Sequence, residues 1–282
     1  MMHFFEKLER ELNFQKEYEK LERMFAYEIY PKGRIYGDTI EDCVEREFRR
    51  WSKRGNYTSF KEIRNQLGFE YSKNFHDHIM SLRRDINIET FLLYCEMLCN
   101  ILIENRWFSP NSMIQEGIRD ILDTLKYDVD KAGFEIKKIN NDYMIVEKNA
   151  VSFEVADAIP EIADAIIEYN HYILRGDIQR KRELLKNISD SVEPRRSELN
   201  RVNKSATDDF FWMVNNMNIR HNNCDSSDPQ RYNEKFASLT IIEKEEWYDV
   251  IYEQALMLFV LLKYSDRKEK IHDFKGSITN FM

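Results

Sequence analysis

The sequence predicts a mainly α fold, a multi-helix bundle with one inserted β-hairpin at about 133–148. Two observations favour helices. Only 8 glycines and 5 prolines interrupt 282 residues, and apolar side chains recur every three or four positions through most of the chain. The third observation is local: between 133 and 148 apolar and polar residues alternate, which is typical of strands. With 43% apolar residues, the chain can bury a substantial core.

The first 130 residues show helical patterns separated by short breaks. An amphipathic pattern runs from His3 to Tyr30, and Pro31 stops it. Further on, Ser109 followed by Pro110 is a favourable helix start, because serine caps the end and proline fits the first turn. The helices predicted in this half are 3–30, 39–51, about 57–68, 73–84, 88–107 and 109–125.

The hairpin marks the main change of pattern in the chain. Residues 133–139 alternate, Asn140-Asn141-Asp142 is typical of a turn, and residues 143–147 alternate again. An isolated hairpin is only marginally stable, so we expect it to pack on helices. We divide the chain at this seam into an N-terminal helical domain, 1–130, and a second domain, 131–282, with the hairpin and the C-terminal helices.

Helical periodicity returns after the hairpin. Pro160 starts or kinks a helix, Gly176 ends one, and Asp177 is a suitable N-cap for the next. The predicted helices are 152–159, 161–174, 178–192, 200–219 and 243–264. Between the last two we expect a polar loop at 222–238, and after Asp266 a polar, frayed tail.

Composition excludes several function classes. A net charge of −8 is unlike that of a protein that coats nucleic acid. Cys95 and Cys99 lie one helical turn apart in an apolar run, as core thiols do, and this usage fits the cytoplasm. No apolar stretch is long enough to cross a membrane. We find no phosphate-binding glycine loop, dinucleotide fingerprint or paired zinc cysteines, so we expect no cofactor and no metal.

The most unusual stretch is 215–223, which reads N-N-M-N-I-R-H-N-N. Five of its nine residues are asparagines, a residue that competes with the helix backbone for hydrogen bonds. Arg220 can hold phosphate oxygens and His221 can transfer protons near neutral pH, which together suit cleavage of a phosphodiester without metal. Asn218, Asn222 and Asn223 would position them. The alternative is an internal hydrogen-bond network that locks the helix to the following loop.

This arrangement resembles the HEPN superfamily. A helix ends in an Asn-rich stretch with an arginine and a polar residue, and a loop and a long amphipathic helix follow. The resemblance implies a small helical bundle, often homodimeric, with metal-independent ribonuclease activity in toxin or abortive-infection systems. Arg220 matches the signature arginine and His221 the polar residue after it. The signature's second histidine would fall at positions 225–227, which are Asp, Ser and Ser.

Two further groups are candidates for the same site. Glu168 and His171 lie three positions apart on a predicted helix, so they share a face, and His171 could supply the missing imidazole. The alternative is a half-buried histidine tied to Glu168. Residues 175–204 contain nine basic and five acidic residues. As RNA contacts we select Arg175, Arg180, Arg182, Arg195 and Arg196. The alternative is a charged surface with internal ion pairs.

Two functional hypotheses follow. In the first, the chain is a HEPN-like bacterial defence or toxin protein, a metal-independent ribonuclease or an RNA-binding protein, acting as a homodimer. In the second, it is a non-catalytic helical interaction module, such as a regulatory subunit that binds a partner protein of a defence complex. The enzyme requires Arg220 and a histidine to converge in an open cleft. The interaction module requires those side chains to be paired within the fold.

Overall fold

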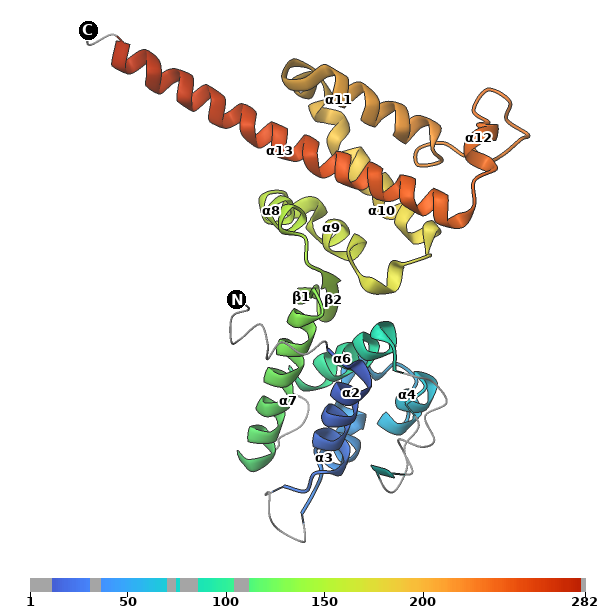
Figure 1. The fold of residues 1–282 in the computed structure, drawn as a ribbon, viewed down its shortest axis with the longest axis vertical. Helices are drawn as coiled ribbons and strands as arrows, with labels where there is room; N and C mark the ends of the chain where they lie inside the picture. The colour runs from blue at the N-terminus through green and yellow to red at the C-terminus, as the bar shows by residue number, and fades with distance from the viewer. Residues whose placement is uncertain (1–11, 31–36, 70–74, 77–85, 104–111, 280–282) are drawn as a thin grey trace, which may run out of the picture. The chain divides into compact units, whose positions relative to one another are not determined.

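The computed structural model describes residues 12–30, 37–69, 75–76, 86–103 and 112–279, and these ranges are mainly α with one antiparallel hairpin, as predicted (Figure 1). The chain divides into two compact units, residues 1–145 and 146–282. We describe each unit by itself. The predicted helix 73–84 and the predicted start at Ser109 fall almost wholly outside the described residues.

The N-terminal unit contains five described α-helices and most of the hairpin. Side chains cap their starts where the sequence offers Asn, Ser or Thr: Asn13 accepts from Lys16 N–H, and Thr39 forms a capping box with Asp42. The elements are α2 (Phe14–Glu22) with a π-helical turn (Arg23–Tyr27), α3 (Ile40–Glu47), α4 (Phe60–Gln66), α6 (Ile88–Leu102), α7 (Ser112–Lys131), β1 (Phe134–Ile139) and β2 (Asp142–Glu147).

A buried charge cluster lies at the centre of this unit. The Arg64 side chain is 0% exposed and holds Glu22 at 2.7 Å and Glu41 at 2.6 Å. Tyr94 donates its hydroxyl to Glu22 at 2.6 Å, and Arg64 Nε donates to a backbone carbonyl, that of Phe69. Burial opposes the charge on Arg64, but the two carboxylates outweigh it and raise the pKa of Arg64 well above its usual value.

The hairpin turns at Asn140 and Asn141, and Asn140 adopts a left-handed backbone with φ 53°. Helix α6 holds its second strand, because the Asn100 amide bonds both N–H and C=O of Tyr143. The boundary between the two units falls inside β2, after Ile145, whereas the sequence division was placed after residue 130. Strand β1 packs on α7 of the N-terminal unit, and this contact accounts for the difference.

The C-terminal unit is helical. Its elements are α8 (Ala150–Ala158), α9 (Ala163–Tyr169), α10 (Ile178–Val192), a 3₁₀ turn (Glu193–Arg195), α11 (Arg196–Asn216), α12 (Glu234–Ala237) and α13 (Ile241–Thr279). Helix α13 packs along α10 and α11 (Figure 1). Their shared core contains Ile188, Phe210, Val214, Ile251 and Leu258, each of them 0% exposed.

Three boundaries in this unit differ from prediction. Helix α11 begins at Arg196, is kinked at Asn203 (φ −151°, ψ 88°) and ends at Asn216, so Met217–Ile219 belong to the turn that follows. The predicted polar loop contains α12. The prediction of a polar, frayed tail after Asp266 is wrong, because α13 continues to Thr279. That segment has no proline and contains three lysines and an arginine, which favour helix.

Candidate functional site

The asparagines of the 215–223 stretch close a turn. Asn218 has φ 61°, a left-handed conformation that asparagine adopts more readily than most residues. The backbone N–H of Asn218 donates to Asn223 Oδ1 at 2.9 Å, and the backbone N–H of Asn223 donates to Asn218 Oδ1 at 3.1 Å. This reciprocal pair closes the chain from 218 to 223 directly after α11.

Asn223 also anchors the following loop. It is 2% exposed, and its amide nitrogen donates to the Arg231 carbonyl at 2.7 Å. Asn233 continues the network, since its amide donates to the Asn216 carbonyl at 3.0 Å and its Oδ1 caps α12. Asn222, by contrast, is exposed. The hydrogen bonds of Asn218 and Asn223 join side-chain amides to backbone groups, so these two residues shape the loop.

Arg220 is paired with carboxylates from the end of α10 and the turn after it. Its Nη2 lies 2.6 Å from Glu193 Oε2 and 3.9 Å from Asp190 Oδ1, and its side chain is 24% exposed. The guanidinium carbon stands 5.8 Å from the centre of the buried Phe211 ring. Arg196 lies over the same ring at 4.3 Å and faces Glu193 at 3.8 Å. Glu193 therefore stands between two arginines. His221, next in the chain, is half-buried.

The other arginines predicted to contact RNA also have partners within the chain. Arg180 holds Glu168 through two bonds, at 2.7 and 2.9 Å, and also contacts Glu183 at 3.1 Å. Arg195 pairs with Glu198 at 2.8 Å. Arg175 pairs with Glu147, and Arg182 donates to the Asn218 carbonyl. These partners within the chain thus offset much of the positive charge of residues 175–204.

His171 lines a hollow to which Arg220, the arginine predicted to act with it, does not contribute. It is 8% exposed and lines this polar hollow of about 240 Å³ together with Arg175, Lys181 and Asp249. The Glu168 carboxylate binds Arg180. The hydrogen bond between Glu168 and His171 joins their backbones, from the His171 N–H to the Glu168 carbonyl at 2.9 Å. The structure therefore brings together His171 and Arg175, and separately Glu168 and Arg180.

The centre of the polar hollow is a lysine that sequence reasoning missed. Lys181 is 6% exposed, and its Nζ lies 2.8 Å from both Glu245 Oε1 and Asp249 Oδ1. Burial would raise the pKa of Glu245, but bonds from Lys181 and from the Gly176 N–H outweigh it and lower that pKa.

Tyrosines complete this network. Tyr169 donates to Asp249 at 2.9 Å and stacks on Tyr252 with ring centres 4.1 Å apart. Burial, and then the Asp249 charge, raise the pKa of Tyr169. Asn170 donates to the Tyr252 hydroxyl at 2.6 Å. The network joins α9, α10 and α13. One signal could have revealed it: Lys181 occupies the same helical face as Leu184, Leu185 and Ile188.

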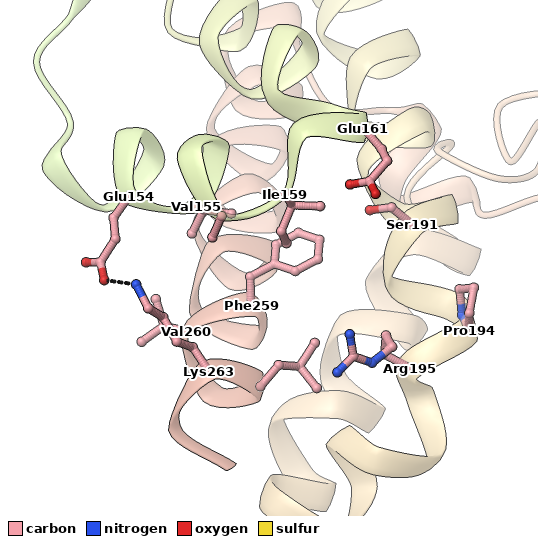
Figure 2. Close-up of a pocket in the computed structure, with 12 residues that line it drawn as sticks. Glu154, Val155, Ile159, Glu161, Ser191, Pro194, Arg195, Phe259, Val260 and Lys263 are labelled. Carbon is pink, nitrogen blue, oxygen red and sulfur yellow. Dashed lines mark hydrogen bonds and ion pairs between the residues drawn. The ribbon is translucent and has the colours of Figure 1, made fainter. Parts of the chain in front are cut away.

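A second hollow is apolar. It measures about 470 Å³ and lies between α8, the end of α10 and α13. Figure 2 shows the Phe259 ring directed into it beside Ile159, with the Lys263–Glu154 ion pair at one edge and Arg195 at another. Its apolar floor and charged edge are typical of a surface that binds another polypeptide rather than a phosphate.

Among the described residues no group of three or more His, Cys, Asp or Glu side chains is arranged to hold a metal ion. No described helix is both long enough and apolar enough to cross a membrane. We compared the chain with known proteins in three ways. A scan against protein-family models, a search of curated proteins and a search of solved structures each found no match.

Proposed function

We propose that this chain is a non-catalytic helical interaction protein in which the 215–223 turn stabilises the C-terminal unit. The observation that carries the proposal is the pairing of Arg220 with Glu193 at 2.6 Å, beside Asp190. The asparagines around it bond backbone groups of the turn and the loop. Arg220, Asn218 and Asn223 each have partners within the chain, as a structural network requires.

Phosphodiester cleavage would need a different electrostatic arrangement. A guanidinium binds phosphate through two parallel N–H donors, and these have to be free or easily released. At Arg220 a phosphate would have to displace Glu193 and approach Asp190, and both carboxylates repel it. Arg175, Arg180 and Arg195 are also paired with carboxylates of the chain, which a phosphate would have to displace.

The surface of the C-terminal unit supports an interaction role. Large apolar side chains are exposed along α13, among them Tyr264 at 53% and Phe274 at 68%. Residue Val260 of the same helix borders the apolar hollow. Contiguous exposed apolar surface of this kind marks contact sites for other polypeptides.

The HEPN-like hypothesis remains the competing proposal. It is supported by the sequence resemblance and by the position of His221, which is half-buried next to an arginine with 24% of its side chain exposed. In that case the chain would be a metal-independent ribonuclease or RNA-binding protein of a defence system, with Arg220 on phosphate and His221 moving protons.

Over-production of the full chain in bacterial cells separates the two proposals. An interaction protein is harmless, and Arg220→Ala only lowers its melting temperature, because the ion pair with Glu193 is lost. The control is Arg201→Ala, which removes an exposed arginine of α11 and should leave the melting temperature unchanged.

A ribonuclease gives the opposite pattern. The wild-type chain would arrest growth, and Arg220→Ala and His221→Ala would each relieve the arrest while their far-ultraviolet circular dichroism stays that of the wild type. That result would overturn the proposal in favour of the HEPN-like site.

A further inference from the structure

Helix α13 has two apolar faces on opposite sides. One face packs on α10 and α11 through buried residues such as Ile251, Leu258 and Leu262. The opposite face exposes six large apolar side chains, each 37% exposed or more: Val250, Met257, Val260, Tyr264, Ile271 and Phe274. The other exposed apolar residues of the helix lie in its first two turns, at Ile241, Ile242 and Trp247. The second face therefore needs an explanation other than the unit's own core.

The spacing on this second face is that of a coiled coil. Positions 250, 257, 264 and 271 lie seven residues apart, and positions 253, 260, 267 and 274 follow each of them by three. We call these eight positions the α13 seam. Six of the eight are apolar, and the pattern spans about three and a half heptads, which is enough for a coiled-coil contact.

The C-terminal part of α13 is only partly covered by its own unit, where Tyr264 and His272 line a hollow with Arg201 of α11. From Lys263 to Gly276 each described side chain is exposed or half-buried, and Figure 1 shows this part of the helix projecting past α8 and α11. With 39 residues the helix is about 58 Å long. The segment from Lys263 to Gly276 is 14 residues long, and an isolated helix of that length is marginal in water unless one face packs. The length of the helix therefore also indicates a partner for the seam.

We infer that the α13 seam pairs with the α13 seam of a second copy of this chain, and that the two helices run antiparallel. The two charged seam positions, Glu253 and Arg267, decide the direction. In an antiparallel pair that sets Val250 opposite Phe274 of the second copy, Arg267 lies opposite Met257, four residues or about 6 Å along the helix from Glu253 of the second copy. Each charged position of the seam then has the opposite charge of the second copy about one turn away, twice by symmetry.

A parallel pair would oppose like charges along the same seam. Glu253 would face Glu253 of the second copy, and Arg267 would face Arg267. The flanking lysines would add to the repulsion, because Lys263 would face Lys268 and Lys270 would face Lys275. In the antiparallel pair Lys268 and Lys270 instead flank Gln254 and Leu256 of the second copy, which carry no charge. The distribution of charge therefore selects one orientation.

This inference deepens the proposed function, because it names the partner of the interaction surface. Val260 belongs both to the seam and to the apolar hollow of Figure 2, so the second helix passes that hollow as it crosses the seam. The inference does not involve Arg220, and its test uses no RNA. An experiment can therefore disprove the pairing of the seam without disproving the absence of ribonuclease activity, and the reverse.

Sedimentation equilibrium of the full chain tests the pairing. We expect the wild type to show twice the mass of one chain at micromolar concentration. Ile271→Glu should weaken association about 100-fold or more, because it places an uncompensated charge in the seam of each copy. The matched control is His272→Glu, which changes an exposed neighbour off the seam and should leave the mass unchanged. A monomeric wild type, or an Ile271→Glu dimer as tight as the wild type, overturns the pairing.

A charge exchange tests the direction. Glu253→Arg alone and Arg267→Glu alone should each weaken the dimer, because each creates a like-charge pair across the antiparallel seam. The double variant Glu253→Arg/Arg267→Glu should restore wild-type association. If the double variant associates no better than the single variants, the antiparallel register is wrong. Circular dichroism of each variant checks that α13 remains folded.

Discussion

Arg64 in the N-terminal unit and Arg220 in the C-terminal unit are each held by two carboxylates, yet their surroundings differ. The Arg64 side chain and its partner Glu22 are 0% exposed, and the second partner, Glu41, is 3% exposed. Arg220 is 24% exposed, and its nearer partner, Glu193, is 42% exposed. The same chemical group is thus sealed from water in one unit and half open to it in the other.

The comparison shows why ion pairing alone does not identify a site. Removing one member of a sealed cluster leaves an uncompensated charge in a low dielectric, whereas water compensates for the loss at a half-open one. Arg64 is therefore an essential part of its core. Arg220 contributes less to stability, and it is the one of the two that a ligand could reach. The argument against phosphate binding at Arg220 is that its guanidinium is paired with Glu193, not that it is buried.

The largest effect is expected at the sealed arginine. Arg64→Met should lower the free energy of unfolding by about 3–5 kcal/mol, because Glu22 and Glu41 would remain buried without a counter-charge. Arg50→Met is the matched control: Arg50 is 70% exposed and pairs with Glu47 one turn away, so its loss should cost about 0.5 kcal/mol or less. Urea unfolding of the full chain measures both. Equal effects of the two substitutions would show that burial does not separate the two classes of arginine.

Next come the asparagines that hold the turn beside Arg220. Asn223→Ala should cost about 2–3 kcal/mol, because the Asn218 N–H and the Arg231 carbonyl each lose a partner. The exposed neighbour Asn222 provides the control, and Asn222→Ala should change stability by about 0.5 kcal/mol or less. Thermal unfolding followed by circular dichroism compares the two. A larger loss at Asn222 than at Asn223 would contradict the network.

A buried carboxylate without an arginine sharpens the comparison. Asp128 is 1% exposed, and burial, together with the nearby Glu17 carboxylate, raises the pKa of Asp128 to about 6. Its folded pKa lies above the ordinary value, so its contribution to stability is fully present below about pH 4 and is lost as pH rises through about 6. Asp128→Asn should therefore stabilise the chain by about 2 kcal/mol at pH 8 and have little effect near pH 4.

Urea unfolding at the two pH values tests the sign of that effect. A gain in stability that is greater at pH 4 than at pH 8 would mean that folding lowers, rather than raises, the pKa of Asp128.

The smallest effect is expected at Arg220 itself. Arg220→Ala should cost about 1 kcal/mol, the sum of a half-exposed ion pair and a contact with Phe211. A double-mutant cycle with Glu193→Ala isolates the pair and should give a coupling of about 0.5–1 kcal/mol. Additive effects of the two substitutions would mean that the contact between Arg220 and Glu193 does not form in solution.

Local sequence patterns could predict much of the fold. Alternation identified the hairpin, and Asp177 as an N-cap identified α10 with its observed bounds. The kink at Asn203 and the continuation of α13 to Thr279 were missed. Neither a polar residue inside a helix nor a charged C-terminal segment carries a strong local signal, because both are also compatible with a loop.

The candidate site was harder to predict, because pairing depends on distant residues. The stretch 215–223 stood out from its composition, and the structure does make Asn218 and Asn223 parts of one network. Sequence spacing could not show that Glu193 reaches Arg220, or that Glu245 and Asp249 of α13 reach Lys181 of α10. Residues distant in sequence provide the counter-charges, so an arginine that looks free in the sequence can be neutralised in the fold.

The most direct test of the account is incubation of the purified chain with single-stranded RNA in the presence of a metal chelator. The wild type is compared with Arg220→Ala and His221→Ala after circular dichroism has shown that all three are folded. The account predicts that none of the three cleaves the RNA faster than buffer alone. Cleavage by the wild type that is lost in both variants would contradict it and establish the 215–223 turn as a catalytic site.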